Sequence, residues 1–202
     1  MKSDRIDRRS ALKILSAAPV AASVAITDAE AQHAHFQAQA ARQTAQKTGA
    51  AFAPKFFTKA EYQTVRLLSD LIIPADERSG GAADAGVPEF MDFILIEQPA
   101  RQIPMRGGLK WLDGECQRRF DKSFAGATDA ERRQVLDDIA APGEVKPNLT
   151  HGQAFFRSFR DLTATGFWTT KMGITDLGYM GNTVVAQWDG CPPEALKKLG
   201  LS

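Results

Sequence analysis

The chain has little of what most reaction centres need. Its 202 residues include two cysteines and three histidines, and the formal net charge is only +1. It contains no Cys-x-x-Cys-His motif for covalent haem, no Gly-x-Gly-x-x-Gly turn for a dinucleotide and no phosphate-binding P-loop. A near-neutral chain also lacks the strongly basic face of a nucleic-acid-binding protein, so we expect no nucleic-acid partner.

The scarcity of histidine limits nucleophilic and metal chemistry. A catalytic triad needs a histidine beside its nucleophile, and His151, at an expected helix start, is the one histidine in the expected folded body. His33 and His35 have no third ligand close in sequence, so we expect them to be solvated. The residues alone therefore predict no catalytic, cofactor-binding or metal site in this chain.

A short apolar run follows two arginines near the start of the sequence. Residues 11–26 are apolar apart from one lysine, two serines and a proline, and the run is shorter than the roughly 20 residues that span a membrane. Arg8 and Arg9 precede it, with Leu12 and Lys13 at the spacing of a twin-arginine export signal, although the aromatic residue often found in that motif is missing. This pathway carries folded proteins, so we expect export after folding.

A processing site and a linker are expected after this run. Ala29 and Ala31 give the small-x-small spacing that a signal peptidase reads, so residues 1–31 are predicted to be a signal peptide. Residues 32–53 are rich in alanine and glutamine and are predicted to be a flexible segment or a loosely held helix. Residues 54–202 then form the folded domain, and the exported body has equal numbers of basic and acidic side chains.

Three capping boxes predict helix starts. In each, a threonine and a Glu or Gln three positions later satisfy each other's free backbone amides. The pairs are Thr58 with Glu61, Thr128 with Glu131, and Thr150 with Gln153. Apolar residues recur at helical spacing after the first box until Pro74, and Gly166 suits the left-handed residue that would end the third helix.

Two more helical runs lie between these boxes. Pro88 suits the first turn of one helix. An apolar face at three- and four-residue spacing runs from Met105 to Phe124, although Gly107 and Gly108 weaken its start. No period-two alternation is visible, so the predicted class is mainly α, a compact helical domain with an extended C-terminal arm rich in glycine and aromatic residues.

Two stretches are expected to be loops. Residues 74–90 belong to a region rich in acidic residues. The spacing of these acids does not match that of a calcium-binding loop, so we expect their carboxylates to cap helices and to aid solubility. These acids are Asp76, Glu77, Asp84, Glu89 and Asp92. Residues 169–196 contain four glycines with Tyr179 and Trp188, and Trp168 comes just before them. This arm either clasps its own domain or recognises another protein, since Tyr and Trp dominate interface energetics.

The two cysteines, Cys116 and Cys191, allow more than one pairing. In an exported chain they are candidates for one internal disulfide, which would pin the C-terminal arm to the middle of the domain. Each could instead be free, or one could bond a partner subunit. Sequence does not supply the geometry that a disulfide requires, so these alternatives stay open.

Three stretches of the sequence resemble a known family. They are "LLSDLIIPADERSGGAADAGVPEFMDFIL", "TATGFWTTKMGITDLGYMGN" and "QWDGCP". Their order and spacing, together with the twin-arginine leader, resemble subunit 3, the small subunit, of the gluconate 2-dehydrogenase family over roughly Phe56 to Pro193.

The resemblance implies a helical subunit that holds no cofactor itself. Its expected partner is a large FAD-containing flavoprotein of the glucose-methanol-choline (GMC) oxidoreductase type, which oxidises a sugar, sugar acid or polyol. A multihaem cytochrome c, carrying haem c, often takes the electrons onward. In such complexes the large subunit commonly crosses the membrane bound to the small one, through the twin-arginine translocase. The complex would then lie in the periplasm, at the outer face of the inner membrane.

We hypothesise that the C-terminal arm is where the partner binds. The expected interface residues are Trp168, Tyr179, Asn182 and Trp188 of the C-terminal arm. The Met180-Gly181-Asn182 step departs from the Gly-Gly-Asn run of many gluconate-type members, so gluconate is not carried over as the substrate. A stand-alone exported enzyme and an exported binding module remain the alternative functions.

Overall fold

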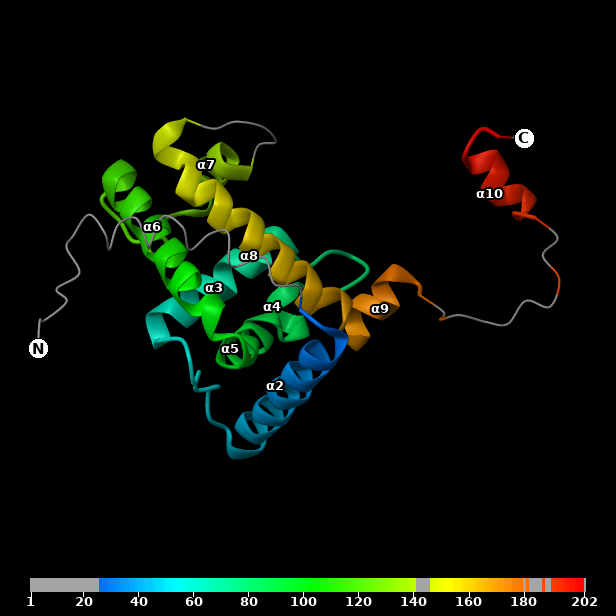
Figure 1. Ribbon diagram of the computed structural model, residues 1–202, viewed down its shortest axis with the longest axis horizontal. Coiled ribbons are helices and arrows are strands. Elements are labelled where there is room, and N and C mark those ends of the chain that lie inside the picture. Colours follow the sequence, from blue (N-terminus) through cyan, green and yellow to red (C-terminus); the bar gives the residue numbers. More distant parts are fainter. Residues whose placement is uncertain (1–25, 141–145, 180, 182–186, 188–189, 202) are drawn as a thin grey trace, which may run out of the picture.

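The computed structural model describes residues 26–140, 146–179, 181, 187 and 190–201. Its regular elements are all helices, and no strand occurs within these residues (Figure 1). The prediction of a mainly α, compact helical domain is therefore confirmed. Six candidate residues lie outside the described residues: Arg8, Arg9, Leu12, Lys13, Asn182 and Trp188.

The helices follow one another through short connections. The α-helices are α2 (Asp28–Thr48), α3 (Lys59–Ile72), α4 (Ala82–Ala85), α5 (Val87–Glu97), α6 (Gln102–Phe120), α7 (Asp129–Ala140), α8 (Thr150–Trp168), α9 (Lys171–Leu177) and α10 (Pro193–Lys198). Short 3-10 turns cover Pro99–Arg101 and Pro147–Leu149. Figure 1 shows α10 apart from the bundle that the other helices form. None of the helices in the described part of the chain is both long and apolar enough to cross a membrane.

The central element of the bundle is α5. Nine consecutive residues, from Val87 to Leu95, are buried. Helices α2, α3, α4 and α8 all contact α5, which explains why its residues are buried on every face rather than along one stripe. Pro88 lies in its first turn, as predicted.

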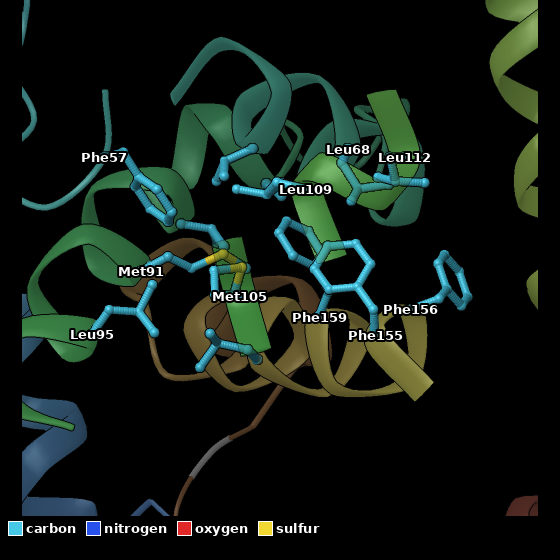
Figure 2. Packing of buried hydrophobic residues seen from close by; sticks show 14 of the residues in the cluster. Phe57, Leu68, Met91, Leu95, Met105, Leu109, Leu112, Phe155, Phe156 and Phe159 are labelled. Carbon is cyan, nitrogen blue, oxygen red and sulfur yellow. The ribbon is translucent and has the colours of Figure 1, made fainter. Parts of the chain in front are cut away.

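Large side chains from α5, α6 and α8 meet in one core. Figure 2 shows Met91 of α5 beside Met105 of α6, with Leu109 and Phe159 close by. Phe155 and Phe159 lie one turn apart on α8 with their ring centroids 5.6 Å from each other. This packing fixes how α8 crosses the bundle and therefore where its C-terminal end lies.

Two of the predicted capping boxes are confirmed. Thr58 N–H donates to Glu61 Oε2 at 2.8 Å, and Glu61 N–H donates back to Thr58 Oγ1 at 3.2 Å. Thr128 and Glu131 form the same pair of bonds at 2.7 and 3.3 Å. Lys122 also bonds Glu131, and these contacts lower the pKa of Glu131 to about 2. Both boxes are local in sequence, so their residues alone were enough to predict them.

The third predicted box and its helix end are wrong. Thr150 is the first residue of α8 rather than its cap, because the 3-10 turn Pro147–Leu149 leads directly into the helix and places Leu149 at the N-cap. Gly166 lies inside α8, which continues to Trp168. A Cβ on Gly166 would lie 2.7 Å from Cδ1 of Phe90, so this glycine lets α8 approach α5.

Gly108 has a similar role in α6. The sequence suggested that glycines weaken the start of this helix, yet α6 is continuous from Gln102 to Phe120. A Cβ on Gly108 would lie 1.8 Å from Cδ2 of Phe155. The phenylalanine ring of α8 therefore packs directly on the backbone of α6, where any side chain would exclude it.

The segment predicted to be flexible or a loosely held helix is largely helical and packed against the domain. Most of residues 32–53 belongs to α2, whose Ala31, Ala34 and Ala38 are buried. Small side chains at this spacing let α2 lie close against α5, and Arg42 of α2 lies 3.7 Å from the buried carboxylate of Glu89. The sequence pattern missed this contact because a face of alanines carries little apolar signal.

A buried carboxylate joins the chain before α3 to α5. Asp92 is fully buried and accepts three backbone N–H groups: Lys55 at 2.7 Å, Phe56 at 2.9 Å and Phe57 at 2.9 Å. The sequence interpretation of Asp92 as a solubility or capping residue is therefore wrong. It holds an irregular segment in place where no helix could satisfy these amides.

Replacing Asp92 with alanine should destabilise the fold strongly. The change leaves three backbone N–H groups without their acceptor, at about 1 kcal/mol or more each, so we expect a loss of about 3 kcal/mol in the free energy of unfolding. Urea denaturation followed by circular dichroism measures it. Asp137→Ala, at an exposed position of α7, is the matched control and should change stability by less than about 0.5 kcal/mol. Equal stability of the two variants would contradict this role of Asp92.

Candidate partner-binding surface

Large apolar side chains are exposed where α8 ends and α9 follows. Their exposed fractions are 39% for Trp168, 39% for Ile174, 62% for Leu177 and 57% for Tyr179. We call these four residues the α9 surface. Ile174 and Leu177 are three positions apart and so lie on the same side of α9. Exposed apolar residues that lie next to one another, unlike single ones, are typical of binding sites for other molecules.

The backbone of α9 is fixed from its inner side. Thr170 caps the helix by accepting Gly173 N–H at 3.0 Å, and Gly178 ends it with a φ of 66°. Gly173 is buried, and a Cβ there would lie 2.2 Å from the carbonyl oxygen of Phe167. Since the inner side of α9 contacts α8 this closely, the exposed side chains project from a well-supported helix. Part of the predicted extended arm is therefore helical.

The loop before α4 contacts α9. The Arg78 guanidinium donates to the Asp176 backbone carbonyl, and its Nη2 lies 3.4 Å from Asp176 Oδ1. Asp76 Oδ1 accepts N–H groups from Arg78 at 2.8 Å and Ser79 at 2.9 Å. The hydrogen bonds from Ser79 and Arg78 lower the pKa of Asp76. The first two sequence stretches that carry the family resemblance thus meet in space, 98 positions apart at this contact.

The two histidines near the chain's start contact distant parts of the fold, and His35 is packed rather than solvated as predicted. His35 stacks on Phe90 with ring centroids 4.4 Å apart, and its Nε2 lies 2.6 Å from Thr169 Oγ1. Burial lowers the pKa of His35, which favours the neutral ring. His33 bonds the carboxylate of Glu97. In the described parts of the chain, no group of three or more His, Cys, Asp or Glu side chains is placed to hold a metal ion.

A buried carboxylate is held by polar side chains inside the fold. Burial and the nearby carboxylate of Glu89 raise the pKa of Tyr62, so the phenol stays protonated. Arg42 of α2 lies against the same carboxylate. Sequence reasoning missed this Arg42, Tyr62 and Glu89 group because its members come from three different helices.

The model of the family described as gluconate 2-dehydrogenase subunit 3 matches residues 59–190, most of the chain. The chain belongs to the gluconate 2-dehydrogenase subunit 3 family. No curated protein was found to match the chain, and no solved structure was found to match it. Family membership makes it an accessory subunit of a dehydrogenase complex, and it confirms the resemblance read from the sequence.

The family match covers the α9 surface completely. It also includes the loop that holds Arg78, whereas α2 lies before it and α10 after it. Two of the expected interface residues, Trp168 and Tyr179, are exposed here, while Ile174 and Leu177 were not foreseen. Their three-residue spacing on a short helix was the signal that could have found them.

The two cysteines of this subunit lie in different environments. Both belong to the described residues and they are not joined: Cys116 is buried in α6 and Cys191 is exposed. Burial, and then the nearby negative charge of Asp113, raises the pKa of Cys116 to about 11. A thiol that is both buried and protonated is a poor nucleophile, so Cys116 is not placed to bond a partner.

Alkylation should distinguish the two thiols. A maleimide at neutral pH without reductant is expected to add one label to the folded chain, at Cys191, and two labels after unfolding in urea, as read by intact mass. Cys191→Ser should give no label when folded and one when unfolded. Zero labels in both states of the unmodified chain would instead reveal a disulfide between Cys116 and Cys191.

Proposed function

We propose that this chain is the non-catalytic small subunit of an FAD-dependent GMC-type dehydrogenase that acts on a sugar, sugar acid or polyol. It binds the flavoprotein subunit, stabilises it and escorts it during export. Membership in a family of dehydrogenase subunits supports a place in such a complex. The oxidation and the choice of substrate then reside in the flavoprotein, which holds FAD.

The α9 surface is the observation that supports binding of the flavoprotein most directly. Each fully buried leucine-sized side chain contributes about 1.5–3 kcal/mol through removal from water, and this surface offers four large apolar or aromatic groups. Because Thr170, Gly173 and Gly178 already fix α9, little further ordering of its backbone is needed on binding.

A polar border surrounds part of this surface. Arg78 contacts Asp176 of α9, and Asp76 and Glu77 directly before it are exposed and charged. An apolar centre with polar residues at its edge is the usual organisation of a protein–protein interface. We therefore assign the loop to the rim and the α9 surface to the centre of the flavoprotein contact.

Export of the complex follows from the leader. Arg8 and Arg9 direct the chain to the twin-arginine translocase, whose tolerance for folded cargo lets an FAD-loaded flavoprotein without its own signal cross with this subunit. The assembled enzyme then works in the periplasm at the outer face of the inner membrane and passes electrons to a multihaem cytochrome c. The leader motif and the family support this assignment.

An acidic residue in the α9 surface should release the flavoprotein. We expect tagged Leu177→Asp, expressed in the native host, to retain at least tenfold less flavoprotein than the unmodified chain, because the complex would have to bury an unpaired charge. The measurement is the yellow FAD absorbance and the mass-spectrometric identity of the proteins that co-purify.

Ile103→Asp is the matched control for this variant. Ile103 is 66% exposed and Leu177 is 62% exposed, so neither substitution disturbs the core. Ile103 lies on α6, on the other side of the bundle from α9 in Figure 1. The assigned interface would be contradicted if both variants lost flavoprotein to the same extent. It would also be contradicted if both retained it. A colourless chain that purifies alone would favour a stand-alone binding module or enzyme.

Replacing Arg8 and Arg9 with lysines should stop export of both proteins. The expected result is a flavoprotein that remains in the cytoplasm, still bound to this chain, because the interface is unchanged. Immunoblots of periplasmic and cytoplasmic fractions, with dehydrogenase activity in each, measure it. A flavoprotein that reaches the periplasm normally would contradict the escort role without affecting the interface result.

A further inference from the structure

The expected processing site lies inside a folded helix. Ala29 and Ala31, the predicted cleavage site, belong to the first turn of α2. Thr27 caps this turn: Glu30 N–H donates to Thr27 Oγ1 at 3.3 Å, and Thr27 N–H donates to Glu30 Oε2 at 2.8 Å. Ala31 N–H donates to the Thr27 carbonyl at 3.0 Å, which closes the helical turn.

The same turn is attached to the rest of the domain. Ala31 is only 5% exposed, and Ala34 one turn later is fully buried. Gln98, which follows α5, donates from Nε2 to Glu30 Oε1 at 3.1 Å. Ile26, just before the cap, packs against the core. Three residues before the Ala31–Gln32 bond (Ile26, Glu30 and Ala31) and Ala34 after it are therefore held by contacts outside α2.

Proteolysis of this bond requires the turn to open. Proteases cut exposed, locally unfolded segments, and their rate follows the population of the open form. Opening here would break the Thr27 and Glu30 capping box and the Gln98 contact, and would expose Ala31. Cutting would also leave a positive α-amine at the N-terminus of α2, where the helix dipole disfavours positive charge.

We propose that folding protects the Ala29–Ala31 site, so that a chain exported in the folded state keeps residues 27–31. This inference rests on the proposed export of folded cargo. The mature chain then begins at or before Thr27. Ser23 and Ala25 offer the same small-x-small spacing upstream of Ile26, which packs on the domain.

The protection itself is measurable on the purified full-length chain. Glutamyl endopeptidase cuts after glutamate, so initial rates at Glu30 and at the exposed loop residue Glu77 can be compared by mass spectrometry. We expect cleavage after Glu30 to be at least tenfold slower than after Glu77. Comparable initial rates at the two residues would overturn the proposal, whether or not the chain is exported.

Two variants of α2 test whether the cap itself slows cleavage, or whether any lost side-chain hydrogen bond in this helix has the same effect on the cleavage rate. Thr27→Ala removes the capping hydroxyl and should speed cleavage after Glu30 several-fold. Thr48→Ala removes a hydroxyl that bonds Thr44 at the other end of the same helix and should leave that rate unchanged. An equal effect of the two variants would contradict protection by the cap.

The N-terminus of the exported chain provides the test in the cell. Mass spectrometry of the chain recovered from periplasmic and membrane fractions should show a first residue at or before Thr27, including an uncut chain. A first residue of Gln32 would overturn the proposal. A chain found only in the cytoplasm would count against the proposed export, while the endopeptidase rates would still decide whether the site is protected.

Discussion

The burial of α5 on every side is the constraint on which the rest of this fold depends. A helix with nine consecutive buried residues needs neighbours all around it, and α2, α3, α4 and α8 supply them. Two of those nine residues are carboxylates, Glu89 and Asp92, so the neighbours must also supply donors. Arg42 faces the first, and the backbone before α3 satisfies the second. The approach of α8 through Gly166 then sets where α9 begins.

Features of the fold that depend on a few adjacent residues could be predicted from the sequence. The Thr58 capping box is one, because both of its partners lie within one helical turn. Features that depend on distant partners could not. Gly166 looks like a helix end until the ring of Phe90, 76 positions earlier, is placed against it. The buried face of α2 consists of alanines, and alanines give too weak an apolar pattern in the sequence to distinguish a packed helix from a linker.

The candidate site was predictable in composition but not in geometry. Trp168 and Tyr179 could be chosen because large aromatics in a glycine-rich stretch are typical of binding surfaces. Leu177 joins them only because α9 forms, and α9 depends on the close contact of Gly173 with the Phe167 carbonyl. The ionic contact of Arg78 with Asp176 joins two segments far apart in sequence, which no local pattern reveals.

The position of α2 makes the cooperative folding unit longer than the sequence shared by the family. The family match begins at residue 59, yet α2, at Asp28–Thr48, covers one side of α5. A domain boundary drawn from similarity alone would uncover that side and leave the carboxylate of Glu89 without Arg42. During synthesis α2 leaves the ribosome well before α5, so α2 gains its partner only when the centre of the domain has been made.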